Sequence, residues 1–456
     1  MQRTLLMALA CGALCTLAAC GGSGGGARHS GDEPEVTQYR YFSGSHLGGD
    51  QEDWELWRTD GTAEGTARVH DVSAEAASYP ENITQIGGRT FFTAWDADSE
   101  NLWVTDGSDD GLTLLVQAGS EGYLNQLTAV ENLLYFVMTT QEHGSELWRS
   151  DGTPAGTQMV IDLTPGSCNS HPASLTAFDG ALYFSAINSC IGRPGLWKTD
   201  GTAEGTVAVL APQNGSYPAN LTPWGDSLYF SAIVETEYGL WKSDGTADGT
   251  TRVRGIRLAQ QANLGWFTVA GDLLFFRAND GEHGTEIWKS DGTEAGTQNV
   301  LDLLPGADSS NPQWLIAHAG QLYFAAYSGG TSSGLWRTDG TAAGTVEIRD
   351  TDGNSVRAMN VPVIYRDSLY FGALWDGRHV MWRLQDGGDV AEILNASVYL
   401  DNGNPPFVLN DRLMFLAEDS AHGVELWRSE GTFESTVLVQ DICPGACSGW
   451  EPYYVP

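Results

Sequence analysis

Short runs of aliphatic, aromatic and β-branched residues alternate along the chain with turns rich in Gly, Asp and Thr. In one clear copy of the pattern the runs are 173–180, 181–186, 195–201 and 206–210. Runs of this composition predict β-strands. In the second run apolar residues stand side by side, which is typical of a strand that is covered on both faces. The pattern therefore predicts a four-stranded antiparallel sheet packed between similar sheets.

This unit returns nine times, because a tryptophan closes a Leu-Trp or similar dipeptide at intervals of 44 to 49 residues. Self-similarity at such a period indicates stacked units, each too small to bury its own apolar face. We therefore expect an all-β fold, a single β-propeller of about nine four-stranded antiparallel blades. Eight blades with one copy displaced, or two unequal rings, are the alternatives. We expect the repeat tryptophans to lie in the core, and they are Trp57, Trp103, Trp148, Trp197, Trp241, Trp288, Trp336, Trp382 and Trp427.

The two ends of the repeat array predict how the ring closes. The first copy begins at Tyr39, already in its second strand, and residues 451–456 align with the first strand of another copy. We expect this C-terminal strand to pair into the N-terminal blade and hide two sheet edges. The connection from strand four to the next strand one is long, so strand one should be innermost. The four-to-one and two-to-three loops then share one face.

A recurrent turn follows most of the tryptophans, as in Asp200-Gly201-Thr202. Glycine permits a positive φ and aspartate caps its own backbone two residues on, so we expect this turn between strands three and four. Lys or Arg follows the tryptophan directly in eight copies. Base and Asp, two residues apart on a strand, share a face, and we expect them to form an ion pair.

The segments 55–62, 146–153 and 286–293 carry the pattern Glu-Leu/Ile-Trp-x-x-Asp-Gly-Thr, and the chain after residue 38 resembles the bacterial ELWxxDGT-repeat family. The resemblance implies a secreted or surface-attached protein, a propeller fold, and no established common activity. Gln385 and Ser108 depart from the pattern and mark degenerate copies.

The N-terminus predicts an anchored protein. Residues 1–19 have the pattern of a signal peptide. The tetrad Leu17-Ala18-Ala19-Cys20 resembles the bacterial lipoprotein cleavage box, which implies acylation of Cys20. Residues 20–38 form a Gly/Ser-rich tether and 39–456 the propeller. Gly21 after the cysteine favours the outer membrane in such lipoproteins. We therefore expect a protein of the bacterial cell envelope whose lipid makes the membrane its first partner.

Four further cysteines follow the anchor, Cys168, Cys190, Cys443 and Cys447. Outside the cytoplasm an even set favours disulfides over a metal site. Of the three pairings we favour Cys168 with Cys190 and Cys443 with Cys447.

The chain has a formal net charge of −35, which excludes nucleic acid as a partner by repulsion. Such a charge favours solubility or the attraction of calcium and cationic partners. Five copies place Asp fourteen residues after the tryptophan, at the start of crossover loops. They cap those loops or form an acidic ring, in which case calcium is the candidate ion, although no cofactor is required. They are Asp71, Asp162, Asp302, Asp350 and Asp441.

Candidate ligand-binding residues lie near the predicted channel mouth. Trp266 and Trp314 begin strand one and could stack on sugars or peptide side chains, or pack the core. His143, His283 and His422 each precede a repeat tryptophan by five residues, where they bind ligand or shape a loop. No strand–helix nucleophile motif, HExxH or P-loop occurs in the sequence. We therefore expect a monomeric binding or scaffolding module for a glycan, peptide or protein; a propeller hydrolase or lyase acting on an envelope or extracellular polymer is the alternative.

Overall fold

The computed structural model describes residues 38–449 except for 47–52, 74–75, 97–98, 121, 167, 189–191, 212–215, 235–236, 257–264, 330–332, 359, 386, 396–398, 401–404, 420 and 446–447. In this part of the chain every regular element is a β-strand. No helix of the length and hydrophobicity needed to cross a membrane occurs there.

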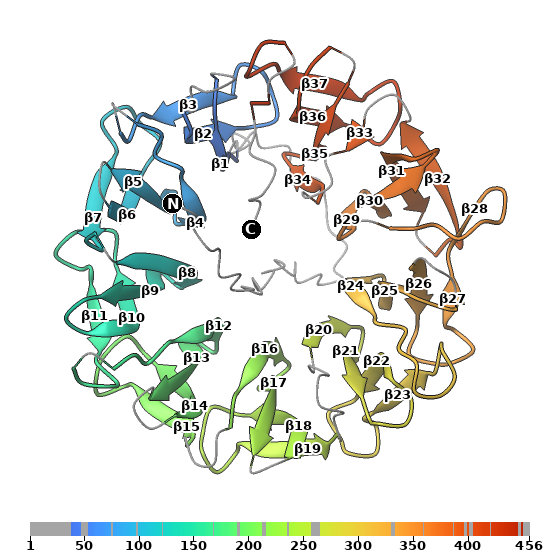
Figure 1. Cartoon of the computed structure of the whole chain (residues 1–456), viewed down its shortest axis with the longest axis horizontal. Helices are drawn as coiled ribbons and strands as arrows, with labels where there is room; N and C mark the ends of the chain where they lie inside the picture. Colours follow the sequence, from blue (N-terminus) through green and yellow to red (C-terminus); the bar gives the residue numbers. More distant parts are fainter. Residues whose placement is uncertain are drawn as a thin grey trace, which may run out of the picture.

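Nine antiparallel sheets are arranged around a common axis as the blades of one propeller (Figure 1), which confirms the predicted fold and blade number. Blade 1 contains β1 (Arg40–Gly44), β2 (Glu55–Thr59) and β3 (Ala67–His70). Blade 2 contains β4 (Glu81–Ile86), β5 (Arg89–Asp96), β6 (Ser99–Thr105) and β7 (Thr113–Gln117). Blade 3 contains β8 (Tyr123–Val130), β9 (Leu133–Thr140), β10 (Gly144–Ser150) and β11 (Gln158–Ile161). Blade 4 contains β12 (Ala173–Phe178), β13 (Ala181–Asn188), β14 (Arg193–Thr199) and β15 (Val207–Leu210).

The remaining five blades follow in chain order. Blade 5 contains β16 (Ala219–Trp224), β17 (Ser227–Val234), β18 (Glu237–Ser243) and β19 (Thr251–Gly255). Blade 6 contains β20 (Gly265–Ala270), β21 (Leu273–Asn279), β22 (Thr285–Ser290) and β23 (Gln298–Leu301). Blade 7 contains β24 (Gln313–His318), β25 (Gln321–Ala326), β26 (Gly334–Thr338) and β27 (Val346–Glu347). Blade 8 contains β28 (Arg349–Asp350), β29 (Val363–Tyr365), β30 (Ser368–Trp375), β31 (Arg378–Gln385) and β32 (Val390–Asn395). Blade 9 contains β33 (Tyr399–Leu400), β34 (Phe407–Leu409), β35 (Arg412–Glu418), β36 (Glu425–Ser429) and β37 (Val437–Gln440).

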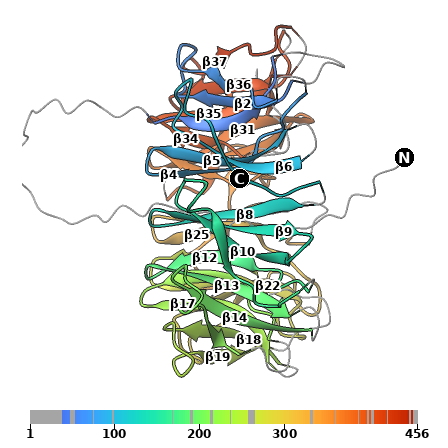
Figure 2. The same cartoon turned by 90° about the vertical axis from the view of Figure 1, so that its left-hand side faces the viewer.

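Strand one of each complete blade is innermost, as predicted. The inner strands β4, β8, β12, β16, β20 and β24 contact one another in this order around the axis. In the side view the blades form one layer with loops at its two faces (Figure 2). Because strands one to four run in alternating directions, the four-to-one and two-to-three loops lie on one face, which we call the crossover face. The three-to-four turns lie on the opposite face, which we call the turn face.

The core of each blade is a cross-strand pair of aromatic residues. Every repeat tryptophan lies opposite a phenylalanine of strand two, from Phe42 opposite Trp57 to Phe415 opposite Trp427. All nine phenylalanines are buried, with at most 3% of their surface exposed. Four of the tryptophans are buried and the other five are half-buried. The tryptophans therefore cover the blades, and the phenylalanines fill them.

The turn motif of strands three and four is explained residue by residue in blade 4. Asp200 Oδ1 accepts hydrogen bonds from the Thr202 amide and hydroxyl at 2.8 and 2.7 Å. Thr206 Oγ1 donates to the Thr202 carbonyl and lies 2.8 Å from Thr199 Oγ1. A Cβ atom at Gly205 would lie 2.1 Å from Asp200 Oδ1, so only glycine fits there. The predicted aspartate cap is confirmed.

In five of the eight copies that place a base after the tryptophan, this base joins one blade to the next, and the expected ion pair with Asp in the same strand was wrong for them. The long side chain passes its own turn and donates to the glycine carbonyl of the neighbouring blade's turn, at distances of 2.7–3.5 Å. A carbonyl offers the base a fixed acceptor, whereas the Asp carboxylate is already occupied by its own turn. The donors are Arg58, Lys242, Lys289, Arg383 and Arg428.

Arg428 closes the ring, because it donates to the carbonyl of Gly61, which is 367 residues away in blade 1, at 3.0 Å. The Asn410 amide also donates to the carbonyls of Gln38 and Asp60. Phe42 packs in one hydrophobic cluster with residues of blade 9. Blade 1 has three strands among the described residues. The predicted closing strand 451–456 lies outside them.

We expect Gly201→Ala to destabilise the propeller more than an ordinary glycine substitution. Gly201 has φ of +92°, and a Cβ atom there would lie 2.5 Å from the Tyr135 hydroxyl of the preceding blade. A left-handed alanine alone costs about 1–3 kcal/mol. Gly166→Ala is the matched control, since Gly166 has φ of +100° and no atom within 4 Å of its Cβ position. Denaturant unfolding should show a larger loss for Gly201→Ala; equal losses would contradict contact between the blades at this turn.

Candidate functional site

The crossover loops are held by buried glutamates that begin strand three. Glu146 is fully buried, and its carboxylate accepts hydrogen bonds from Ser170 Oγ at 2.6 Å, the Ser170 amide at 3.1 Å and Thr164 Oγ1 at 3.0 Å. The Leu163 amide adds a fourth bond at 3.2 Å. One carboxylate thus fixes both ends of the loop that joins β11 to β12.

Three other blades repeat this arrangement. Glu55 binds the Val72 amide and Ser78 Oγ, Glu286 binds the Ser310 amide and hydroxyl, and Glu425 binds the Cys443 and Gly449 amides. All three glutamates have 0% of their surface exposed. Burial raises the pKa of each carboxyl group to about 7, because the desolvated charged form is disfavoured. Burial also raises the pKa of Glu146.

Three buried serines at the ends of crossover loops precede a residue that faces solvent. Ser170 and Pro172 are buried while His171 between them is exposed, and the same order recurs at 216–218 and 310–312. His171 has φ of 41° and Tyr217 has φ of 38°. Bulky residues seldom adopt such left-handed conformations, and the cost is borne only where the surrounding structure holds them. The repeated Ser-x-Pro triplet is the sequence signal that could have revealed these positions.

Exposed aromatic side chains are concentrated on the crossover face. Six Phe, Tyr or Trp residues among the described ones expose more than a third of their surface. Five lie at strand ends or loops of the crossover face, namely Trp95, Tyr123, Tyr217, Tyr238 and Trp375. Phe433, in a three-to-four turn, lies on the turn face. Sequence reasoning missed the role of the five because their loops vary in length.

The three predicted histidines lie in crossover-face loops, each beside an aspartate. His143 Nδ1 lies 3.3 Å from Oδ2 of Asp162, one of the predicted aspartates. His283 and His422 instead pair with aspartates three residues earlier, Asp280 and Asp419, at 2.7 and 2.8 Å. The hydrogen bond and charge of Asp280 raise the pKa of His283. An Asp three residues before a His-Gly pair is the sequence signal that could have predicted the partners of His283 and His422.

Four of the predicted aspartates make local contacts. Asp162 Oδ1 accepts from the Thr164 amide and Asp302 Oδ2 from the Gly306 amide. Asp350 Oδ1 accepts from the amides of residues 352 and 354, and Asp71 lies 3.6 Å from Arg68 Nη1. The bonds of Asp162, Asp302 and Asp350 are those of loop caps, whereas Asp71 forms an ion pair.

Asp441 has a buried Oδ1. No group of three or more His, Cys, Asp or Glu side chains that could hold a metal occurs within the described part of the chain. Calcium binding stays a prediction.

Several predicted residues fall on parts of the chain that the structure leaves undescribed. The signal peptide 1–19, Cys20 and nearly all of the tether 20–38 lie outside the described residues, as do Cys190 and Cys447. The backbone of Trp266 belongs to β20, but its side chain is also outside them. Lipidation at Cys20, both disulfide pairings and ligand binding by Trp266 therefore stay predictions.

Trp314 is half-buried and packs against the hydrophobic cluster between blades 7 and 8. Its φ of 52° places it at the bulge of β24, a position that Asn82, Ser174 and Asn220 occupy in other inner strands. The aromatic surface of the crossover face thus arises mainly from other residues than those predicted.

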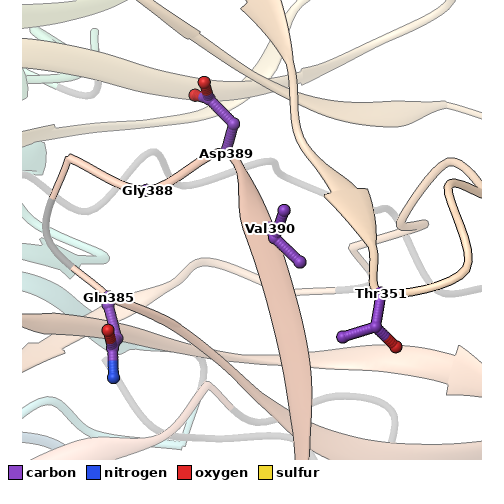
Figure 3. Close-up of a pocket in the computed structure, with 5 residues that line it drawn as sticks. All are labelled: Thr351, Gln385, Gly388, Asp389 and Val390. Carbon is purple, nitrogen blue, oxygen red and sulfur yellow. The ribbon is translucent and has the colours of Figure 1, made fainter.

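A surface pocket lies at the outer edge of blade 8, where β28 pairs with β32 in parallel (Figure 3). It is lined by Thr351, Gln385, Gly388, Asp389 and Val390. The Asp389 carboxylate accepts a hydrogen bond from Arg337 Nε at 2.5 Å, so this acid serves an ion pair. This pocket offers no nucleophile and base in contact.

Similarity to known proteins is found among solved structures. No protein-family model matches the chain, and no curated protein matches it. Among solved structures, puromycin hydrolase is 12% identical with a TM-score of 0.40 over 75% of this chain and 58% of that one. A prolyl endopeptidase is 11% identical with a TM-score of 0.44 over 79% and 49%. The β-propeller domain of the Trilobed protease from Pyrococcus furiosus is 12% identical with a TM-score of 0.37 over 70% and 96%. The chain thus spans about half to three fifths of the length of the first two.

Proposed function

We propose that this chain is a binding module that presents the crossover face of its propeller to a partner in the bacterial cell envelope. The observation that carries the proposal is the placement of five of the six exposed aromatic residues on that face. Exposed aromatic side chains are enriched where proteins bind partners, because they offer a large rigid contact area. The buried glutamates beneath the face hold its loops before any partner arrives.

The cell-envelope location rests on the lipoprotein-like tetrad 17–20 and on the resemblance of the repeats to surface-attached proteins. Acylation of Cys20 would leave the propeller on a tether, free to turn either face toward a partner. Replacement of Cys20 by serine should move the protein from the membrane fraction to the soluble fraction, whereas an unchanged distribution would contradict the lipid anchor.

We expect the Cys20→Ser chain to sediment with purified bacterial cell envelopes through its crossover face. Replacing the five exposed aromatic residues of that face by alanine should weaken this binding at least tenfold, since the few hot-spot residues of an interface, often Trp or Tyr, cost about 2 kcal/mol or more each when truncated. Phe433→Ala is the control, because it removes an equally exposed ring from the turn face. Equal sedimentation of the five-residue variant and its parent would overturn the proposal.

A further inference from the structure

Three consecutive blades expose a ring at the same register of the crossover face. Tyr123, His171 and Tyr217 stand at or just before the start of the inner strands β8, β12 and β16. Tyr123 exposes 45% of its surface and Tyr217 exposes 54%. The equivalent position of blade 2 is Tyr79, which is half-buried. The rings thus form a row along one arc of the propeller.

The row is fixed in spacing. β12 contacts both β8 and β16, and the Gln126 side-chain amide donates to the Pro172 carbonyl at 3.1 Å, from blade 3 to blade 4. Ser170 and Pro172 hold His171 from both sides, and Ser216 and Pro218 do the same for Tyr217. A residue with a positive φ would be relieved by glycine, so a ring in this conformation indicates a use for the side chain.

Resting on the proposed function, we infer that this row binds a neutral polysaccharide, with the rings of Tyr123, His171 and Tyr217 stacked on successive sugar units. The apolar C–H face of a pyranose fits the face of an aromatic ring, and a polymer of identical units fits rings repeated at identical positions. The side-chain amide of Gln126, three residues after Tyr123, donates to the Pro172 carbonyl beside His171 and so keeps the strands that bear the first two rings together.

Peptides and anionic polysaccharides fit this row of rings less well than a neutral polysaccharide does. An extended peptide would add to the free edge of an inner strand, but a bulge with a left-handed residue interrupts that edge at positions 126, 174 and 220. Pro172 and Pro218 also lack the amide donor that such pairing needs. An anionic polysaccharide would be repelled by 58 acidic against 23 basic residues.

Affinity electrophoresis of the Cys20→Ser chain tests this inference in gels that contain laminarin, hydroxyethyl cellulose, chitosan or alginate. We expect at least one of the two neutral glucans to retard the protein, and alginate not to do so. Tyr123→Ala combined with Tyr217→Ala should weaken that binding at least tenfold. The double Tyr→Phe variant, which keeps both ring faces, and Phe433→Ala should stay within about twofold of the parent. Circular dichroism should show all variants folded, as their changed side chains are exposed.

The results separate this inference from the proposed function. Absence of retardation by both neutral glucans, or equal retardation of the double alanine variant, would overturn the polysaccharide row. Retardation by chitosan without retardation by either neutral glucan would also overturn it, because the binding would then reflect charge alone. If envelope sedimentation still depends on the five aromatic residues in that case, the proposed function stands without the polysaccharide. Loss of both signals would overturn both.

Discussion

Replacement of Phe324 by alanine is expected to lower the free energy of unfolding by about 3–5 kcal/mol, as for other fully buried phenylalanines. Phe324 has 0% of its surface exposed and packs between blades 6 and 7 with Phe275 and Leu322. Its partner across the strands, Trp336, is half-buried and packs at the margin of the same cluster. Trp336→Ala should therefore cost less, although it removes the larger side chain.

Chemical denaturation of both single variants checks this order. Phe324→Leu is the control, because it keeps an aliphatic side chain in the site and leaves a smaller cavity. A larger loss for Trp336→Ala than for Phe324→Ala would contradict a core centred on strand two. The same comparison is available in blade 5 with Phe230 and Trp241.

This contrast shows how far the sequence predicts the fold. The period of 44 to 49 residues and the unalternating second strand predict nine antiparallel blades, and the long four-to-one connections predict that strand one is innermost; the structure confirms both. The residue that marks the repeat most clearly in the sequence is not the most buried one. The tryptophans identify each repeat, but the phenylalanines fill the core of each blade. The partner of Arg428 was also beyond prediction, since the Gly61 carbonyl meets it only when the ring closes.

The sequence predicts the face of the propeller on which the candidate site lies, but it does not predict the residues that form the site. The order of strands places the predicted histidines on the crossover face, where the structure finds them. Which side chains face solvent depends on backbone conformation, as at His171 and Tyr217, and Trp314 shows that an inner-strand aromatic can pack inward instead. The buried role of the motif glutamates could not be read from a charged residue, which is ordinarily exposed.

A variant with Glu55, Glu286 and Glu425 all replaced by glutamine is expected to lose much of the pH dependence of stability between pH 4.5 and 7. Each carboxyl has an ordinary pKa of 4.5, which burial raises to about 7 in the folded protein. Between these values the folded state binds protons more tightly than the unfolded chain, so the free energy of unfolding falls as the pH rises. The contribution is complete below pH 4.5 and is lost as the pH passes about 7.

The size of this effect follows from the pKa shift. One pKa unit corresponds to about 1.4 kcal/mol, so each buried glutamate contributes on the order of 1–3 kcal/mol to the pH dependence. The carboxyl oxygen Oε1 of Glu55 and Oε2 of Glu425 are buried without a hydrogen-bond partner among the described atoms, so nothing replaces the water that each would lose in the charged form. Glutamine keeps the shape and one acceptor, and it removes the buried charge that the parent carries above pH 7.

Denaturant unfolding at pH 5, 6, 7 and 8 measures the effect for Glu286→Gln, the triple variant and the parent. The parent should lose stability across this range, Glu286→Gln should lose less, and the triple variant should lose least and exceed the parent in stability at pH 8. Glu294→Gln is the control, because Glu294 lies exposed in a turn and should keep the slope of the parent. If Glu286→Gln follows the parent at every pH, the Glu286 carboxyl titrates as an ordinary exposed group. The loop that places Ser310 and Asn311 would then be braced by a carboxylate that is charged throughout this range.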